Sequence, residues 1–354
     1  MNSYSENSIT PSGVLEGYIH KPGDHCFTSA LRDVFEFHGF NMSEEMLFGL
    51  GSGLGLGYIN MRGFPDPILG GRSESPDGVA CKRLGIQVNK FKTKDPEKGW
   101  LRLKERFDQG IPSMIVIDMA YLPYHDLPED FHFGQHAIVV CGYNPEKNVV
   151  YVSDTSFEDI KEVTLEDLKK GRSSSVNKFM DPYNMIYEYN FPVKLNDLDQ
   201  IIPEALRQAG KNILESPRLK NMLGITSGLK SITKFSKDLL KWVKLPIDKL
   251  SYRCFMLAGY ISEFGTGGGS FRYLYSRFLK ESYEINNDPS IINLSTSYSN
   301  IGDKWEDVAG LFREVQKANM NPQELTTHFQ SVISILSEIK ELENQNAQLL
   351  VNYT

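Results

Sequence analysis

Cys26 lies where the sequence predicts that a turn gives way to a helix. In the stretch GDHCFTSALRDVFEFHG, residues 23–39, turn-forming residues precede the cysteine, and the apolar spacing after it predicts an amphipathic helix that ends at Gly39. The N-terminus of a helix carries partial positive charge, which stabilises the thiolate, the reactive form of cysteine. The position therefore favours a nucleophile over an inert buried thiol.

A cysteine nucleophile needs a base, and His136 is the best placed of the seven histidines. It starts the predicted strand HAIVVCGYN, and Asp154 ends the next strand, VVYVSDT. Two antiparallel strands joined by a tight turn bring their far ends together, so the carboxylate could orient the imidazole and stabilise its charged form. We therefore predict a triad of Cys26, His136 and Asp154.

Two other arrangements of these residue types compete with the triad. His25 could act as the base, but adjacent residues on a helix diverge, so we expect only a minor role for it. A metal site built from His125, His132 and His136 lacks a regular ligand spacing and an obvious carboxylate partner, and we expect no metal.

The remaining cysteines and histidines fit ordinary structural roles. Cys141 falls in the middle of a predicted strand and Cys254 within an apolar helix, where a thiol is a small hydrophobic side chain. We expect the same of Cys81, and surface or structural positions for the other histidines: His38, His125, His132 and His328.

The elements that must position the triad follow an α+β pattern. The first half mixes predicted helices (residues 26–38, 43–50, 75–85 and 100–110) with strands (residues 86–91, 112–122, 136–144 and 149–155). From Leu198 onward the periodicity is helical, with no convincing strand. We predict an α+β catalytic domain over residues 1–190 with an antiparallel sheet, and an all-α domain over residues 191–354 that covers the cleft.

Composition excludes several function classes. The 354 residues carry 38 Lys and Arg against 45 Asp and Glu, a net charge of −7, which disfavours nucleic-acid binding. No apolar stretch approaches the roughly 20 residues of a membrane span. The four cysteines are scattered, and the N-terminal residues lack the basic and apolar regions of a signal peptide, so we expect a cytoplasmic protein.

The chain resembles the butirosin-biosynthesis H protein family over nearly its whole length. Three stretches match the N-terminal domain of that family, HCFTSALRDVFEFHG, SEEMLFGLGSGLGLGYI and GQHAIVVCGYNPEKNVVYVSDT, and a fourth, ISEFGTGGGSFRYLYSRFLKES, resembles the helical domain that often follows it. The family is similar in turn to papain-like cysteine peptidases, especially bacteriocin-processing ones. The resemblance implies a papain-like fold for the first domain.

The resemblance also implies an acyltransferase. Such an enzyme takes an acyl group from the phosphopantetheine thioester of an acyl carrier protein and passes it to an amine, which is an aminoglycoside in the namesake pathway. It uses no cofactor of its own. Carried over by position, Cys26 is the nucleophile, His136 the base and Asp154 its orienting partner.

One position departs from the papain-like pattern. Those enzymes commonly place a glutamine six residues before the nucleophile, where it donates to the oxyanion, and here that residue is His20. An imidazole N–H could take over this role beside the backbone N–H of Cys26.

Two glycine-rich segments could approach a ligand closely. Residues 49–57, GLGSGLGLG, contain Gly51 and Gly53, and residues 265–272, GTGGGSFR, contain Gly267 and end at Arg272. Glycines and an arginine before a helix could hold the phosphate of phosphopantetheine. Tight packing explains the same glycines equally well.

Three functions therefore remain in competition. The acyltransferase leads; a cysteine peptidase or amidase would use the same triad, and a non-catalytic protein would keep the fold to bind a carrier protein or a peptide. The identity of the acyl group and acceptor, and homo-oligomerisation, stay open.

Overall fold

The two most apolar runs of the first half form neighbouring strands. In the computed structural model, β5 (Ser113–Ile117) pairs antiparallel with β6 (His136–Asn144), and all of β5 and eight of the nine residues of β6 are buried. Side chains alternate between the two faces of a strand, so burial of successive residues means that both faces are covered. The helices in contact with these strands are α1 (Cys26–Phe37), α4 (Pro96–Asp108) and α5 (Leu165–Arg172).

The sheet around these strands is antiparallel. Its order is β4-β9-β5-β6-β7-β8, and β1 pairs with β6. The further strands are β1 (Gly13–Val14), β4 (Gln87–Phe91), β7 (Val149–Ser153), β8 (Lys161–Thr164) and β9 (Ile186–Asn190). The connection from β5 to β6 contains two short 3-10 segments, η1 (Met119–Tyr121) and η2 (Pro123–His125).

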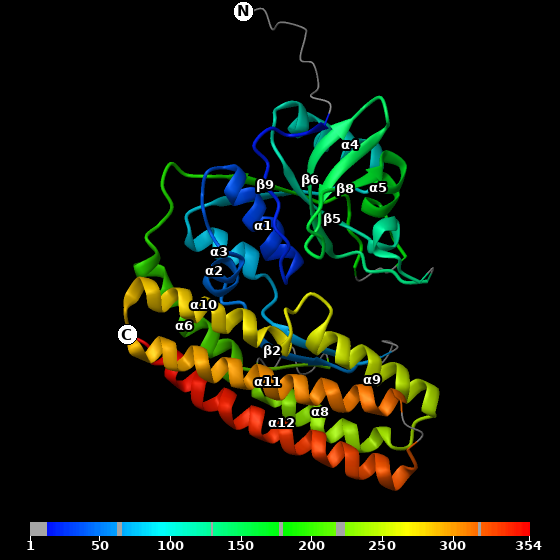
Figure 1. Ribbon diagram of the computed structural model, residues 1–354, viewed down its shortest axis with the longest axis vertical. Coiled ribbons are helices and arrows are strands. Elements are labelled where there is room, and N and C mark those ends of the chain that lie inside the picture. The colour runs from blue at the N-terminus through cyan, green and yellow to red at the C-terminus, as the bar shows by residue number, and fades with distance from the viewer. Residues whose placement is uncertain (1–12, 62–65, 129, 177–179, 217–223, 318–319) are drawn as a thin grey trace, which may run out of the picture. The chain divides into compact units, whose positions relative to one another are not determined.

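The structure describes residues 13–61, 66–128, 130–176, 180–216, 224–317 and 320–354. Contacts between these residues divide the chain into two units, one from residues 1–44 and 85–195 and the other from residues 45–84 and 196–354 (Figure 1). The large sheet and its helices make up the first unit.

Long helices dominate the second unit, and α8, α10, α11 and α12 lie alongside one another in Figure 1. Its helices are α2 (Glu44–Leu50, from residue 45), α3 (Pro76–Arg83), α6 (Leu198–Leu214), α8 (Leu229–Trp242), α9 (Ile247–Ser262), η3 (Gly269–Phe271), α10 (Arg272–Asn286), α11 (Pro289–Lys317) and α12 (Pro322–Val351). Within the described ranges, no helix is both long and apolar enough to cross a membrane.

The predicted α+β fold class is confirmed, and two features of the second unit differ from expectation. The second unit contains a small sheet of β10 (Ile225–Ser227), β2 (Leu54–Ile59) and β3 (Ile68–Arg72), although the sequence analysis expected no strand after residue 198. Residues 45–84 fall within the predicted first domain, whereas their contacts group them with the helices of the second unit. Pairing of β2 with β10 accounts for part of this grouping.

Candidate active site

Cys26 is the first residue of α1. His25 caps the helix with extended backbone angles (φ −122°, ψ 118°), so the chain turns into the helix at the cysteine itself. The thiol is partly exposed, whereas the other three cysteines are buried. The side chain therefore lies at the positive end of a helix dipole and remains within reach of a substrate.

The turn before Cys26 is held by Glu44, which the sequence analysis missed. The backbone N–H groups of Asp24 and His25 donate to its carboxylate at 3.0 and 2.7 Å, and the Thr28 hydroxyl donates at 3.2 Å. Burial raises the pKa of Glu44 to about 7, against the opposing effect of the two backbone donors. No sequence pattern links Glu44 to Cys26, because the contact depends on how the chain returns after α1.

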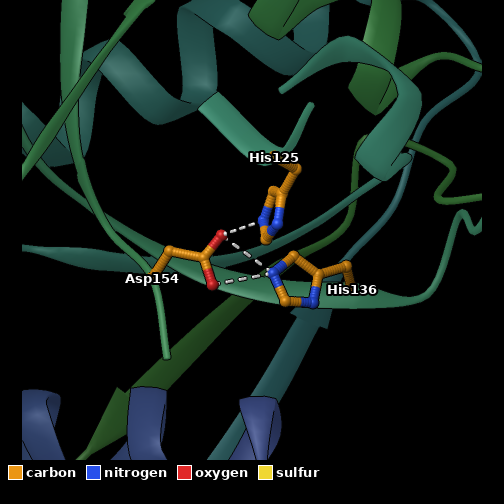
Figure 2. A group of neighbouring side chains, drawn as sticks. All are labelled: His125, His136 and Asp154. Atoms are coloured by element: carbon orange, nitrogen blue, oxygen red, sulfur yellow. Dashed lines mark hydrogen bonds and ion pairs between the residues drawn. The ribbon is translucent and has the colours of Figure 1, made fainter. Parts of the chain in front are cut away.

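His136 and Asp154 meet at the far ends of β6 and β7. The Nε2 atom of His136 lies 2.9 Å from both carboxylate oxygens (Figure 2). The side chains of His136 and Asp154 are 7% and 0% exposed. Burial alone would lower the pKa of His136, but the charge and hydrogen bond of Asp154, with a smaller contribution from Cys26, raise it to about 10. Burial opposes ionisation of Asp154, yet the two histidines beside it hold its pKa far below the usual range.

Cys26 interacts with the same imidazole. A hydrogen bond and a charge interaction with Cys26 both contribute to the raised pKa of His136. Because Nε2 of His136 faces Asp154, Nδ1 is the nitrogen that remains for the sulfur. The structure thus brings together the three residues that the sequence analysis grouped, all within the first unit.

Asp154 also accepts hydrogen bonds from two neighbours that the sequence analysis did not assign to the site. Oδ2 lies 2.9 Å from Nε2 of His125 and 3.0 Å from the Tyr124 hydroxyl. His132, the third histidine of the metal site considered above, instead binds Asp118 through Nδ1 at 2.8 Å. The sequence predicts a strand that continues to residue 122, whereas β5 ends at Ile117 and the 3-10 segments η1 and η2 follow it. The sequence pattern therefore does not indicate this arrangement.

His125, His136 and Asp154 carry atoms of the types that bind metals. Their potential ligand atoms lie within 4.8 Å of one another. The two imidazoles already make hydrogen bonds to the carboxylate, so the geometry is explained without an ion.

The other histidines lie in local contacts. Nδ1 of His25 is 3.0 Å from the Thr28 hydroxyl, which directs this ring toward its own helix. His38 donates to the carbonyl of Val34 one turn earlier, and His328 donates to the carbonyl of Leu311.

His20 is held by both ring nitrogens. Nδ1 lies 2.6 Å from Asp33, and Nε2 donates to the carbonyl of Phe157 at 2.8 Å. Burial lowers the pKa of His20, but Asp33 and the Phe157 carbonyl raise it overall. In this arrangement the ring has no N–H left for an oxyanion. Instead, His20 ties the loop after Asp154 to the helix that begins at Cys26.

The glycines singled out in the sequence lie in the second unit and pack tightly. A Cβ atom on Gly51 would lie 2.1 Å from the carbonyl oxygen of Pro76, and one on Gly53 would lie 2.6 Å from the ring of Phe48. Gly267 has a φ of +64°, in the left-handed region that favours glycine. Close packing and backbone conformation account for these three residues.

Arg272 is not placed to bind a phosphate. Its side chain is 0% exposed and pairs with Glu343 of α12, which is equally buried. The guanidinium also donates to the carbonyl oxygens of Gly55, Gly71 and Ser270. A bound anion would have to replace these partners, so the prediction of a phosphate ligand at this residue is wrong.

We expect Arg272→Met to destabilise the second unit by about 3–5 kcal/mol, because it leaves the Glu343 carboxylate buried without its partner. Denaturant unfolding would measure the loss. Arg277→Met on the same helix is the control. Arg277 forms an ion pair with Glu45, and their side chains are 43% and 22% exposed, so the pair contributes at most about 1 kcal/mol to the free energy of unfolding. Equal losses in the two variants would contradict a structural role specific to Arg272.

Two family models match the chain in succession. The model described as "Butirosin biosynthesis protein H, N-terminal" matches residues 25–155, a segment that contains the whole Cys26, His136 and Asp154 cluster. The model described as "Domain of unknown function (DUF4872)" matches residues 166–350, more than half of the chain. A comparison with curated proteins gives no match. The order of the two domains is the one that the resemblance implied, and the chain has the domain architecture of the butirosin biosynthesis protein H family.

Proposed function

We propose that the protein is an acyltransferase that moves an acyl group from the thioester of an acyl carrier protein to an amine through an acyl-enzyme on Cys26. The observation that carries the proposal is the contact between Cys26, at the start of α1, and His136, whose ring is hydrogen-bonded to the buried Asp154. The family supports a role in biosynthesis related to butirosin.

The first step forms the acyl-enzyme. An imidazolium on His136 would stabilise negative charge on the Cys26 sulfur, as in other cysteine–histidine pairs. The thiolate attacks the thioester carbonyl, and a new C–S bond forms. As the tetrahedral intermediate collapses, the bond to phosphopantetheine breaks, and His136 gives its proton to the departing sulfur.

The second step transfers the acyl group. The amine attacks the acyl-enzyme carbonyl, and neutral His136 takes one of its protons through Nδ1. The C–N bond forms, the C–S bond to Cys26 breaks, and the thiolate–imidazolium pair is restored. The backbone N–H of Cys26 is the candidate oxyanion donor, since His20 is already engaged with Asp33 and Phe157.

The donor and acceptor belong to the same proposal. The acyl donor is a phosphopantetheine thioester on a carrier protein, the acceptor is a small amine such as an aminoglycoside, and the enzyme works in the cytoplasm without a cofactor. These assignments rest on the family resemblance.

The products separate transfer from hydrolysis by the same triad. We expect an amide when both an acyl thioester and an aminoglycoside amine are supplied, and a stable acyl-enzyme without the amine, measured by mass spectrometry of products and of intact protein. Rapid release of free acid without amine would identify a cysteine hydrolase. No covalent adduct and no turnover with a panel of acyl thioesters and peptides would favour the binding protein.

A further inference from the structure

Asp154 accepts more hydrogen bonds than a histidine–carboxylate pair requires. His136 reaches both carboxylate oxygens, and Oδ2 also accepts from His125 and Tyr124. Figure 2 shows the two imidazoles converging on the carboxylate from different segments of chain. An ionised carboxylate without solvent contact needs several donors, because burial removes the hydration that would otherwise stabilise its charge.

The extra donors come from η2, which is itself fixed in place. The ring of His125 lies with its centroid 5.1 Å from Phe157 and 5.5 Å from His136. Tyr124 packs edge-on against Phe157 at 5.1 Å. The carbonyl of Phe157 accepts the bond from His20 that links this loop to α1. The segment that carries His125 therefore contacts Asp154 directly. Through Phe157 and His20 it is also linked to α1, the helix that begins at Cys26.

We propose that His125 is a positioning residue, whose Nε2–H fixes the Asp154 carboxylate in the orientation that keeps the His136 ring directed toward Cys26. The proposal rests on the function given above. Because a carboxylate can only accept, His125 must carry its proton on Nε2 in this contact. The hydrogen bond also favours the ionised carboxylate and is one cause of the lowered pKa of Asp154.

The chemical role differs from that of His136. When Cys26 is acylated or released, the charge changes on the imidazole of His136, and Asp154 must stay anionic to stabilise the imidazolium. His125 acts on the reacting atoms only through Asp154. Replacement of His125 should therefore lower activity only in a protein that retains Asp154.

The alkylation rate of Cys26 by iodoacetamide tests this role without requiring an acyl donor. We expect His125→Phe, which keeps a ring against Phe157 but loses the donor, to lower the rate about 10- to 100-fold, the range for a lost hydrogen bond to a charged group. His125→Gln, whose amide N–H can still donate, should recover most of it. His132→Phe is the matched control, because His132 lies in the same connection but binds Asp118.

A double-mutant cycle separates positioning from general damage. In an Asp154→Ala background, His125→Phe should change the alkylation rate less than about twofold, since the two act through one contact. A wild-type rate in His125→Phe, an equal loss in His132→Phe, or an undiminished loss in the Asp154→Ala background would overturn the proposal. Stoichiometric metal in the purified protein would also overturn it, because the three side chains would then be ligands.

Thermal unfolding of each variant monitors folding. If His125→Phe does not fold, His125→Asn takes its place, because its side chain is polar but too short to reach Asp154.

The experiments distinguish failure of this proposal from failure of the proposed function. The expected alkylation pattern with no acyl transfer would refute the transferase and leave the role of His125 in thiol activation intact. Acyl transfer together with equal alkylation rates in the wild type and the His125 variants would refute the role of His125 and leave the transferase intact.

Discussion

Replacement of Cys26 by alanine should abolish the acyl-enzyme and lower acyl transfer by about 10⁴- to 10⁶-fold, the range for loss of a catalytic nucleophile. The sulfur is the atom that forms the covalent bond, and no neighbouring side chain can replace it. Intact-mass measurement after incubation with an acyl thioester should show the added acyl group on the wild type and none on Cys26→Ala.

The other cysteines supply the control for this result. Cys81, Cys141 and Cys254 are 1% exposed or less, and burial raises the pKa of Cys254 to about 12. Cys254→Ala should therefore retain both the adduct and turnover, and peptide mapping after brief alkylation at neutral pH should find the label on Cys26. An adduct that persists in Cys26→Ala, or labelling of Cys26 no faster than of Cys81, would refute a catalytic thiol.

The parts of the fold that depend on local sequence could be predicted. The amphipathic spacing after Cys26 defines α1, which ends at Phe37, two residues before the predicted end at Gly39. The apolar run from His136 coincides with β6, and a tight turn leads into β7. Because the hairpin brings its ends together, the contact of His136 with Asp154 follows from two strands and one turn.

Features that depend on distant parts of the chain could not be predicted in this way. Arg272 beside a run of glycines has the composition of an anion site, but its partner Glu343 lies on α12 and shows no sequence relation to it. Strand β10 is three residues long, too short for periodicity to reveal, and it forms by pairing with β2. His125 reaches Asp154 from a connection without regular pattern. In each case tertiary contact, rather than local propensity, decides the structure.

Loss of the Asp154 carboxylate should have the second largest effect. We expect Asp154→Ala to lower the acylation rate by about 10³- to 10⁴-fold, because the His136 ring loses the group that fixes its tautomer and stabilises its charged form. The pH profile should change as well. The charge and hydrogen bond of Asp154 hold the pKa of His136 near 10, so the imidazolium of the variant should deprotonate closer to the ordinary value of 6.5. The alkaline limb of the rate profile, where the general acid is lost, should move to lower pH.

Two matched variants distinguish this effect from a general loss of structure. Asp154→Asn keeps an acceptor but removes the charge, so its rate should lie between those of the wild type and Asp154→Ala, with the alkaline limb still displaced downward. Asp118→Asn alters a second buried carboxylate, 2% exposed, which binds His132 rather than His136. It should lower stability and leave the alkaline limb unchanged. If the alkaline limb of Asp154→Ala lay at the same pH as in the wild type, another group would control the ionisation of His136. That result would contradict the role assigned to the His136–Asp154 pair.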